Sequence, residues 1–221
     1  MNNLNIETKD LFSTNDPLLK NVFDNAKYPW EILPLIKEIV KKGLEEGIEG
    51  YHLLRDGVLV GDNVTIFDTA TIIPPAIIGA NTEIRPGAFL RGNVIIGEAC
   101  VIGNSSELKN CILLNHVQVP HYNYVGDSIL GDYAHMGAGS ILSNLKSDGK
   151  NVVIHADIDY DTNLRKVGSF LGEHADIGCG SVLNPGTIIG KNTQVYPLTM
   201  LRGAYPESSI VKGTNEVIEK R

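Results

Sequence analysis

An aliphatic residue at every sixth position is the feature that most constrains this chain. The series occupies ten positions in the middle of the sequence: Val60, Ile66, Ile72, Ile78, Ile84, Leu90, Ile96, Ile102, Leu108 and Leu114. A period of six fits neither an isolated helix nor a hairpin, and it is typical of a β-solenoid whose repeats each supply one short strand and one corner. The sequence therefore predicts a mainly β fold, a parallel β-helix of hexapeptide repeats.

The residue after each aliphatic position changes character along the series. It is glycine at 61, 79, 97 and 103, which suits a tight corner. In a later stretch the glycines give way to Arg85, Arg91, Lys109, Asn115 and His121. The six-residue spacing of the aliphatic positions also becomes irregular after Leu114, where Pro120 occupies the next apolar position. A repeat that replaces its corner glycines with polar and basic residues in one stretch indicates a functional site there.

The period divides the chain into segments. Residues 1–56 lack it and carry apolar residues at helical spacing, which predicts an N-terminal helical cap over one open end of the solenoid. The solenoid is expected over 57–205, with an insertion at about 146–166 that alternates partly, as a hairpin does. Residues 206–221 are expected to form a C-terminal arm.

Composition excludes several classes of partner. The formal net charge of −7 argues against a nucleic-acid-binding surface. No run of about eighteen apolar residues predicts a membrane span. The N-terminus has no signal-peptide pattern, and the three cysteines are widely spaced and odd in number. These features favour a cytoplasmic protein without a disulfide framework.

Spacing brings two cations together. Three hexapeptides make one coil of eighteen residues in known solenoids of this kind, and Arg91 and Lys109 are eighteen residues apart. Their side chains should leave one corner on adjacent coils, about 4.8 Å apart. Such a pair suits a phosphate or carboxylate ligand. The alternative is a solvated basic patch balanced by nearby acidic residues, of which the candidates are Glu83, Glu98 and Glu107.

His121 lies twelve residues after Lys109, where the period slips. A histidine alone is more often structural than catalytic. At a corner near two cations it becomes a candidate general base, because its side chain titrates near neutral pH.

Beyond the period, one combined motif resembles a known family. It consists of Glu107-Leu108-Lys109, then His121-Tyr122-Asn123-Tyr124-Val125-Gly126-Asp127-Ser128, then Gly137-Ala138-Gly139-Ser140 and Asn144, with Arg85-Pro86-Gly87-Ala88 upstream. This pattern is similar to the acetyltransferase half of bifunctional N-acetylglucosamine-1-phosphate uridyltransferase. The match is tight over about 85–145, and the repeats of 167–205 are similar more loosely.

The resemblance implies a left-handed parallel β-helix, a homotrimer with active sites between subunits, and acetyl transfer from acetyl-CoA to glucosamine-1-phosphate without a metal. In this sequence His121 falls on the catalytic base and Lys109 on the phosphate-binding lysine. The arginine partner falls on Arg85 by motif and on Arg91 by stacking, and stacking favours Arg91. The sugar contacts fall on Tyr124, Asn144 and His135, and Ala138 lies near the thioester.

The chain departs from the family at several places. His135 stands where the family has an asparagine, and Leu145 where it has an aromatic residue. Cys179 and Tyr196, at the positions expected to line the coenzyme site, stand where small residues are usual. The first 56 residues contain no Gly-rich nucleotide loop after a strand, so the resemblance does not extend to the uridylyltransferase half.

Two other functions stay open. One is a metalloenzyme similar to γ-class carbonic anhydrase, because His116 and His121 have the five-residue spacing of its histidine pair; the third histidine is replaced by Asn81. The other is a non-catalytic trimeric module that binds a sugar phosphate and has lost acetyl-CoA. The departures at Leu145, Cys179 and Tyr196 motivate this second reading.

Overall fold

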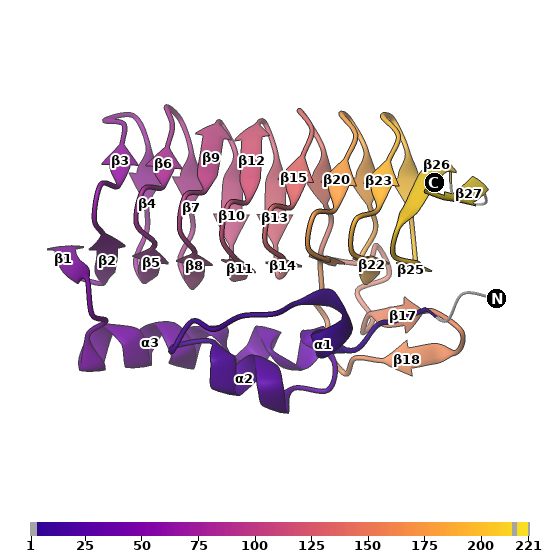
Figure 1. Cartoon of the computed structure of the whole chain (residues 1–221), viewed down its shortest axis with the longest axis horizontal. Helices are drawn as coiled ribbons and strands as arrows, with labels where there is room; N and C mark the ends of the chain where they lie inside the picture. The colour runs from indigo at the N-terminus through magenta and orange to yellow at the C-terminus, as the bar shows by residue number, and fades with distance from the viewer. Residues whose placement is uncertain (1–3, 214–215, 221) are drawn as a thin grey trace.

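The computed structural model of the protein describes residues 4–213 and 216–220 and is mainly β (Figure 1). Short strands wind into a solenoid whose three walls are parallel sheets, so the predicted parallel β-helix of hexapeptide repeats is confirmed. Sheet A contains β1 (Tyr51–Arg55), β2 (Val58–Gly61), β5 (Ala76–Ile78), β8 (Val94–Ile96), β11 (Cys111–Leu113), β14 (Ile129–Leu130), β19 (Ser169–Leu171), β22 (Thr187–Ile189) and β25 (Ala204–Tyr205).

The other two walls have the same construction. Sheet B contains β3 (Thr65–Ile66), β6 (Glu83–Ile84), β9 (Val101–Asn104), β12 (Gln118–His121), β15 (His135–Met136), β20 (Asp176–Ile177), β23 (Gln194–Val195), β26 (Ser209–Gly213) and β27 (Glu216–Glu219). Sheet C contains β4 (Thr71–Ile72), β7 (Phe89–Leu90), β10 (Glu107–Lys109), β13 (Tyr124–Gly126), β16 (Ile141–Leu142), β21 (Val182–Leu183) and β24 (Met200–Leu201).

The aliphatic series fills the solenoid interior, with one correction. Leu113, not Leu114, pairs with Ile96 and faces inward, and Val119 rather than Pro120 is the next interior residue. A shortened step of five residues therefore runs from Leu108 to Leu113, whereas the sequence places the first irregularity after Leu114. Leu114 instead packs outside the solenoid against the N-terminal segment. Because of this step, the coils through Leu108 and Val125 are seventeen residues long rather than eighteen.

The corner glycines serve a different purpose from the one expected. Gly79 and Gly103 do not have positive φ; a Cβ at Gly79 would lie 2.4 Å from the Gly97 carbonyl carbon, and one at Gly103 would lie 1.5 Å from the Pro120 oxygen. Their role is to permit the close approach of successive coils. Asparagine and aspartate, residue types that tolerate the left-handed conformation, recur at the positions with positive φ, as at Asn110 (φ 47°) and Asp127 (φ 48°).

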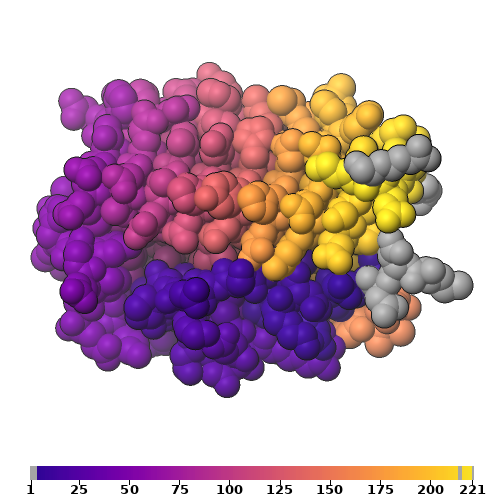
Figure 2. Space-filling model, in the orientation of Figure 1, coloured from indigo at the N-terminus to yellow at the C-terminus, as the bar shows by residue number. Residues whose placement is uncertain are grey.

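The N-terminal helices lie along a side wall rather than over the open end that the sequence predicts. They are α1 (Thr8–Leu11), α2 (Lys20–Asn25), α3 (Ile36–Glu46) and the short 3₁₀ turns η1 (Pro29–Glu31) and η2 (Leu33–Leu35). Figure 1 and Figure 2 show this segment running beneath sheet A along the solenoid. Ile36, Ile39 and Trp30 are buried with the outward residues Ile77 and Ile95 in a second core. The open end is instead bordered by β1, which pairs antiparallel with β2.

The second half of the solenoid is interrupted once. After β16 the chain leaves the corner between sheets C and A, forms a hairpin of β17 (Val153–His155) and β18 (Asp159–Asp161), and re-enters at β19. The hairpin packs beside the N-terminal segment, where Tyr160 contacts Tyr28 and Trp30. Beyond residue 205, β26 continues sheet B and β27 folds back on it. Residues 214, 215 and 221 of the expected C-terminal arm lie outside the described part of the chain.

Candidate functional site

One edge of the solenoid carries Lys109 and is called here the Lys109 edge. The residue after each interior residue of sheet C stacks along it, at the corner between sheets C and A. From β7 onward these residues are Arg91, Lys109, Gly126, Ser143, Asn184 and Arg202. Arg91 and Lys109 therefore lie on adjacent coils of one corner, as their spacing predicts.

The two cations have acidic partners within the chain. Arg91 Nη1 lies 2.6 Å from Glu107 Oε1, and its guanidinium sits 5.9 Å from the centroid of the Phe89 ring. Lys109 Nζ lies 3.6 Å from Asp127 Oδ2. Glu107, one of the candidate partners of a solvated patch, thus neutralises Arg91. An anionic ligand at this edge would compete with Glu107 for an exposed guanidinium and would approach a half-buried ammonium.

Asp127 organises the edge. Its side chain is buried, and its two oxygens accept hydrogen bonds from Asn110 Nδ2 at 2.9 Å and from Asn144 Nδ2 at 2.5 Å. With Lys109, three donors converge on one carboxylate, two from the preceding coil and one from the following coil. Hydrogen bonds to a charged acceptor are about twice as strong as neutral ones, so Asp127 fixes the positions of Lys109 and Asn144.

Tyr124 closes the same cluster from the outer face of sheet C. Its hydroxyl group is hydrogen bonded to the Asn144 side chain, and burial raises the pKa of Tyr124 above its usual value. The phenol therefore stays protonated at neutral pH. Gly126 makes the contact possible, because a Cβ there would lie 2.5 Å from the Tyr124 hydroxyl and 2.7 Å from Asn144 Nδ2.

His121 lies on a different edge, at the corner between sheets B and C, called here the His121 edge. Successive backbone bonds define it: Gly139 N donates to the His121 carbonyl at 2.9 Å, Gly180 N to Ala138 at 2.8 Å, and Leu198 N to Cys179 at 2.9 Å. The residues that stack along the His121 edge are Asn104, His121, Ala138, Cys179 and Pro197. The predicted base and two of the predicted coenzyme contacts thus share one ridge.

The His121 backbone is held firmly while its side chain is exposed. Its N–H donates to Asn123 Oδ1 at 3.0 Å. Asn123 is buried and donates through Nδ2 to the Gly137 carbonyl at 2.8 Å and to Ser140 Oγ at 3.0 Å. One asparagine therefore ties the corner of His121 to the corner of Ala138. The His121 imidazole makes no hydrogen bond or ion pair with any residue that the structure describes, which leaves both ring nitrogens available to a ligand.

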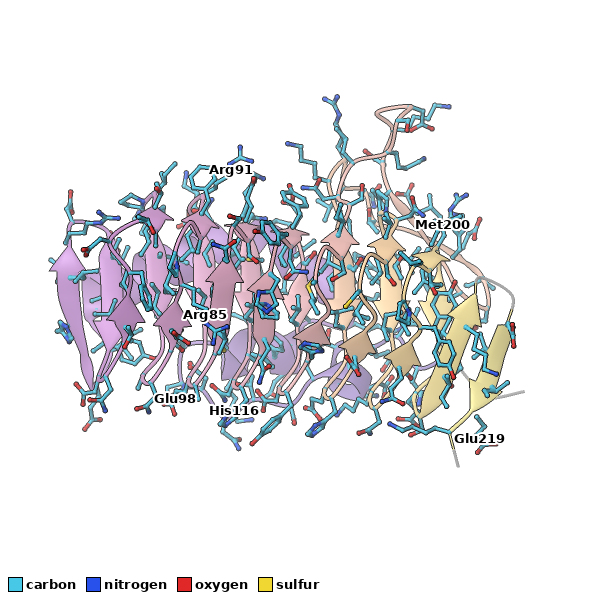
Figure 3. All side chains as sticks on the ribbon, turned by 90° about the horizontal axis from the view of Figure 1, so that it is seen from above. Arg85, Arg91, Glu98, His116, Met200 and Glu219 are labelled. Carbon is cyan, nitrogen blue, oxygen red and sulfur yellow. The ribbon has the colours of Figure 1, made fainter. Side chains whose placement is uncertain are left out.

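Three predicted site residues lie apart from the Lys109 cluster. Arg85 follows the last residue of β6 at the corner between sheets B and C, where its Nε lies 3.0 Å from Glu83 Oε2. His135 is on sheet B, with Nδ1 2.8 Å from Asp176 Oδ1. Tyr196 is exposed beside the His121 edge, in the row that holds Gly137 and Gly178. Figure 3 shows Arg91 on one long edge and Arg85 away from it.

His116 and His121, the histidine pair that suggests a metalloenzyme, do not lie close together. His116 precedes β12 and His121 ends it, so they lie at opposite ends of one strand. The His116 ring stacks on Tyr133 with centroids 4.4 Å apart. Figure 3 places His116 beside Glu98, along the edge opposite Arg91. Within residues 4–213 and 216–220, no three His, Cys, Asp or Glu side chains are grouped to hold a metal ion.

Asn123 and Asp127 were not predicted as site residues. Both carry a signal in the sequence. Asn123 occupies an interior corner place that holds the small residues Ser106 and Ser140 in the neighbouring coils. Asn93, Asn110, Asp127 and Asn144 recur every seventeen residues, which is the true coil length in this region.

Comparison with known proteins relates the chain to one group. The model of the "GMPPB C-terminal domain" family matches residues 72–163. The bifunctional protein GlmU of Methanococcus aeolicus is 30% identical over 220 residues, which cover 91% of this chain and 50% of that protein. GlmU of Synechococcus elongatus is 33% identical over 137 residues, covering 55% of this chain and 30% of that protein. The chain spans about half the length of the archaeal relatives it matches.

Solved structures with a similar course of chain are more distant. A perosamine N-acetyltransferase from Caulobacter crescentus, in complex with CoA and GDP-perosamine, is 19% identical with a TM-score of 0.44, over 72% of this chain and 56% of that one. The N-acyltransferase AntD from Bacillus cereus is 22% identical with a TM-score of 0.42, over 79% and 91%. Among the described residues, no helix has both the length and the apolar character needed to span a membrane.

Proposed function

We propose, on the basis that the chain is a relative of the GlmU proteins and of the site described above, that it transfers an acetyl group from acetyl-CoA to the amine of an amino sugar phosphate such as glucosamine-1-phosphate. The observation that carries the proposal is the placement of two edges on either side of sheet C. The Lys109 edge offers cations and fixed amides, and the His121 edge offers an exposed imidazole.

The distance between the edges suits such an acceptor. Strands of sheet C are two or three residues long. His121 and Gly126, the residue of the Lys109 edge on the same coil, are five residues apart, so at roughly 3.3 Å per residue the two edges lie at most about 16 Å apart. A phosphorylated monosaccharide can bridge this face, with its phosphate near Lys109 and Arg91 and its amine toward His121. Tyr124, between the two edges, would contact the sugar ring.

The proposed reaction is a direct displacement, with no covalent enzyme intermediate. His121 takes a proton from the acceptor ammonium group, and the free amine nitrogen attacks the thioester carbonyl carbon. The new C–N bond forms and the C–S bond breaks. The leaving thiolate takes up the second proton that the attacking nitrogen loses, and the proton held by His121 passes to solvent. A well-placed general base contributes roughly 10² to 10⁴-fold. A backbone N–H near Ala138, which is exposed beside His121, is the proposed donor to the tetrahedral oxyanion.

The acceptor site is proposed to be completed in a homotrimer. His135 and Asn144 are both assigned to the sugar by resemblance, yet they lie on different sheets of one chain. A neighbouring copy that packs its sheet B against the sheet C face would bring a second His135 toward the Lys109 edge. This arrangement accounts for a site whose residues are divided between walls.

The residues expected to line the acetyl-CoA site favour a second candidate function, a non-catalytic module that binds a sugar phosphate. Tyr196 places a bulky ring next to Gly178 and Gly137 in its row, on the coils that carry Cys179 and Ala138. Leu198, also at this ridge, is 84% exposed. Such side chains would narrow a path for a pantetheine arm along the His121 edge.

A thiol-release assay with acetyl-CoA tests the proposal against a panel of amino sugar phosphates. The matched control is glucose-1-phosphate, which carries the same phosphate and lacks the amine. We expect thiol release with an amino acceptor and none with the control. Calorimetry separates the second candidate, since glucosamine-1-phosphate binding without acetyl-CoA binding would favour the module and contradict the enzyme.

A further inference from the structure

The Lys109 edge continues past the proposed acceptor site and ends at a second cation. Leu142, Leu183 and Leu201 stack in register inside sheet C, so the residues that follow them, Ser143, Asn184 and Arg202, extend the row of Lys109. Lys109 and Arg202 are separated by four strand spacings, about 19 Å. The row thus has a basic group at each end and a hydroxyl and an amide between them.

The insertion builds a wall over this second half of the row. The chain departs after Asn144 and returns at Val167, whose N–H donates to the Asn144 carbonyl at 3.0 Å. Between these points it encloses a cavity of about 530 Å³, called here the insertion pocket. Its lining includes Ser143, Asn184 and Arg202 from the solenoid and Leu145, Lys146 and His155 from the insertion. Figure 3 shows the insertion rising from the long edge that carries Arg91.

Arg202 contacts a histidine rather than a carboxylate, although the carboxylates of Asp148 and Asp159 also line the pocket. Its Nη2 lies 2.7 Å from His155 Nε2, and His155 Nδ1 lies 2.7 Å from Asp159 Oδ1. A guanidinium can only donate, so Nε2 is the acceptor and the ring proton is on Nδ1, which donates to Asp159. No carboxylate among residues 4–213 and 216–220 lies within 4.0 Å of Arg202.

The other residues of the pocket suit a ligand that has both an anionic group and a planar ring. Lys146 Nζ is 3.4 Å from Asp148 Oδ2, so its charge is already balanced. Arg202 remains as the cation that can make a bidentate contact. Leu145 is 42% exposed and lies with Pro185 in the lining, which gives an apolar surface beside the polar row. A mostly preformed pocket of this size accommodates a small organic ligand.

We propose that the insertion pocket binds the phosphate of a nucleotide, with Arg202 as its principal cation and the Leu145 side supporting the base. The nucleotide is either a separate ligand or the distal part of a nucleoside-diphosphate-linked acceptor. The second case rests on the proposed function and refines its substrate class from a sugar phosphate to a sugar nucleotide.

Calorimetry of the full chain with UDP, GDP and inorganic pyrophosphate tests the site. We expect binding of at least one probe, weakened at least tenfold by Arg202→Gln. Arg165→Gln, an exposed arginine of the insertion outside the pocket lining, is the matched control and should not weaken binding. Asn184→Ala gives an independent variant if Arg202→Gln fails to fold. Absence of binding by the wild-type chain, or equal binding by both arginine variants, would overturn the proposal.

Steady-state kinetics then distinguish a nucleotide that is part of the acceptor from one that binds as a separate ligand. If the acceptor is nucleotide-linked, Arg202→Gln should lower kcat/KM for UDP- or GDP-linked amino sugars at least tenfold and leave that for glucosamine-1-phosphate unchanged. If the nucleotide is a separate ligand, calorimetric binding stays Arg202-dependent while neither acceptor rate moves. Loss of all acyl transfer with intact nucleotide binding would contradict the proposed function and leave the pocket in place.

Discussion

The side chains at the two edges of sheet C fall into two groups: buried residues that hold their neighbours in position, and exposed residues that can contact a ligand. Asn123 and Asp127 are buried and fix their neighbours through several hydrogen bonds each. His121 and Arg91 are exposed and held mainly by their backbone or by one carboxylate. Preorganised buried groups that support exposed reactive ones are the arrangement that a binding face requires.

Replacing His121 with alanine should lower the turnover number by roughly 10² to 10⁴-fold, because the proposed base is removed. The fold should persist, since the imidazole is exposed and makes no side-chain hydrogen bond in the described part of the chain. Steady-state kinetics together with circular dichroism measure both effects. His116→Ala is the control, as this exposed histidine lies on the far side of β12. Unchanged turnover in His121→Ala would remove His121 from the mechanism.

Lys109→Ala should raise the KM for an anionic acceptor by roughly tenfold to a hundredfold, the range for losing one charge-assisted hydrogen bond. The KM for acetyl-CoA should not change, because Lys109 lies on the opposite edge from Ala138. Kinetics with each substrate varied separately measure the split. Lys20→Ala, on α2 with Asp24 as its partner, provides a control far from the site. Equal changes in both KM values would argue against a phosphate contact.

At the scale of the elements, the solenoid coil was predictable and its exact length was not. The aliphatic period indicated the interior residues correctly as far as Leu108. Leu113 and Leu114 are adjacent and chemically identical, so hydrophobicity alone could not show which one faces inward. The recurrence of Asn93, Asn110 and Asp127 every seventeen residues does resolve it, because left-handed corners favour asparagine and aspartate.

The position of the helical segment also had a signal in the sequence. Strands of sheet A carry apolar residues on both faces, as in Ala76-Ile77-Ile78 and Val94-Ile95-Ile96. A strand buried on both sides reads as a continuous apolar run. The outward-facing residues Ile77 and Ile95 therefore predict that another segment packs along sheet A. The helix α3 and the neighbouring N-terminal helices pack there. The placement of Lys109 and His121 at different corners was predictable, because twelve residues are two hexapeptides. What the spacing could not show is the position of the shortened step between them.

One carboxylate fastens the N-terminal segment to the solenoid. Glu173 accepts hydrogen bonds from Ser13 N and Ser13 Oγ at 2.7 Å and 2.5 Å and pairs with Lys191 at 2.9 Å. Burial acts to raise the pKa of Glu173, but the contacts with Ser13 and Lys191 outweigh it, so the pKa is lowered. A lowered carboxyl pKa adds stability above the unfolded-state value of 4.5, and this contribution is lost as pH falls through the folded-state value.

Glu173→Gln should therefore destabilise the protein by about 1 kcal/mol at pH 7, a value reduced by partial solvent screening. The difference from wild type should shrink as the pH falls below 4.5. Denaturant unfolding at pH 7 and at about pH 3.5 measures it, and comparing the two proteins cancels the titration of other groups. Glu216→Gln, an exposed glutamate at the C-terminal hairpin, is the control. A difference that stays constant with pH would contradict the assigned role of Glu173.

At the scale of the whole molecule, the walls of the solenoid are not equivalent. Sheet A is covered by the helices, as Figure 2 shows along its lower flank. Sheets B and C and the His121 edge remain uncovered and expose apolar side chains, including Leu198, Tyr122 and Ile141. Exposed apolar side chains also occur elsewhere, as at Leu35 and Leu53, so the proposed assembly rests mainly on the division of the site residues between sheets B and C. The proposed homotrimer would bury this side and join the His135 wall of one copy to the Lys109 edge of the next.

Light scattering on a size-exclusion column tests this assembly. The expected mass is about three times the 24.0 kDa of one chain. Leu198→Glu together with Ile141→Glu should reduce it, because charges would be buried at the proposed contact. Leu53→Glu, at an exposed position of β1, should leave the mass unchanged. A monomeric wild-type chain would contradict the shared site.

The central claim is acyl transfer to an amine of a phosphorylated sugar, with His121 as the base. The most direct measurement is mass spectrometry of the product after incubation of the full chain with ¹³C-acetyl-CoA and glucosamine-1-phosphate. The account predicts a sugar phosphate carrying one labelled acetyl group, formed by the wild-type protein and by His116→Ala and lost in His121→Ala. Labelled product that His121→Ala forms at the wild-type rate would contradict the mechanism, and absence of any labelled amino sugar phosphate across the acceptor panel would contradict the function itself.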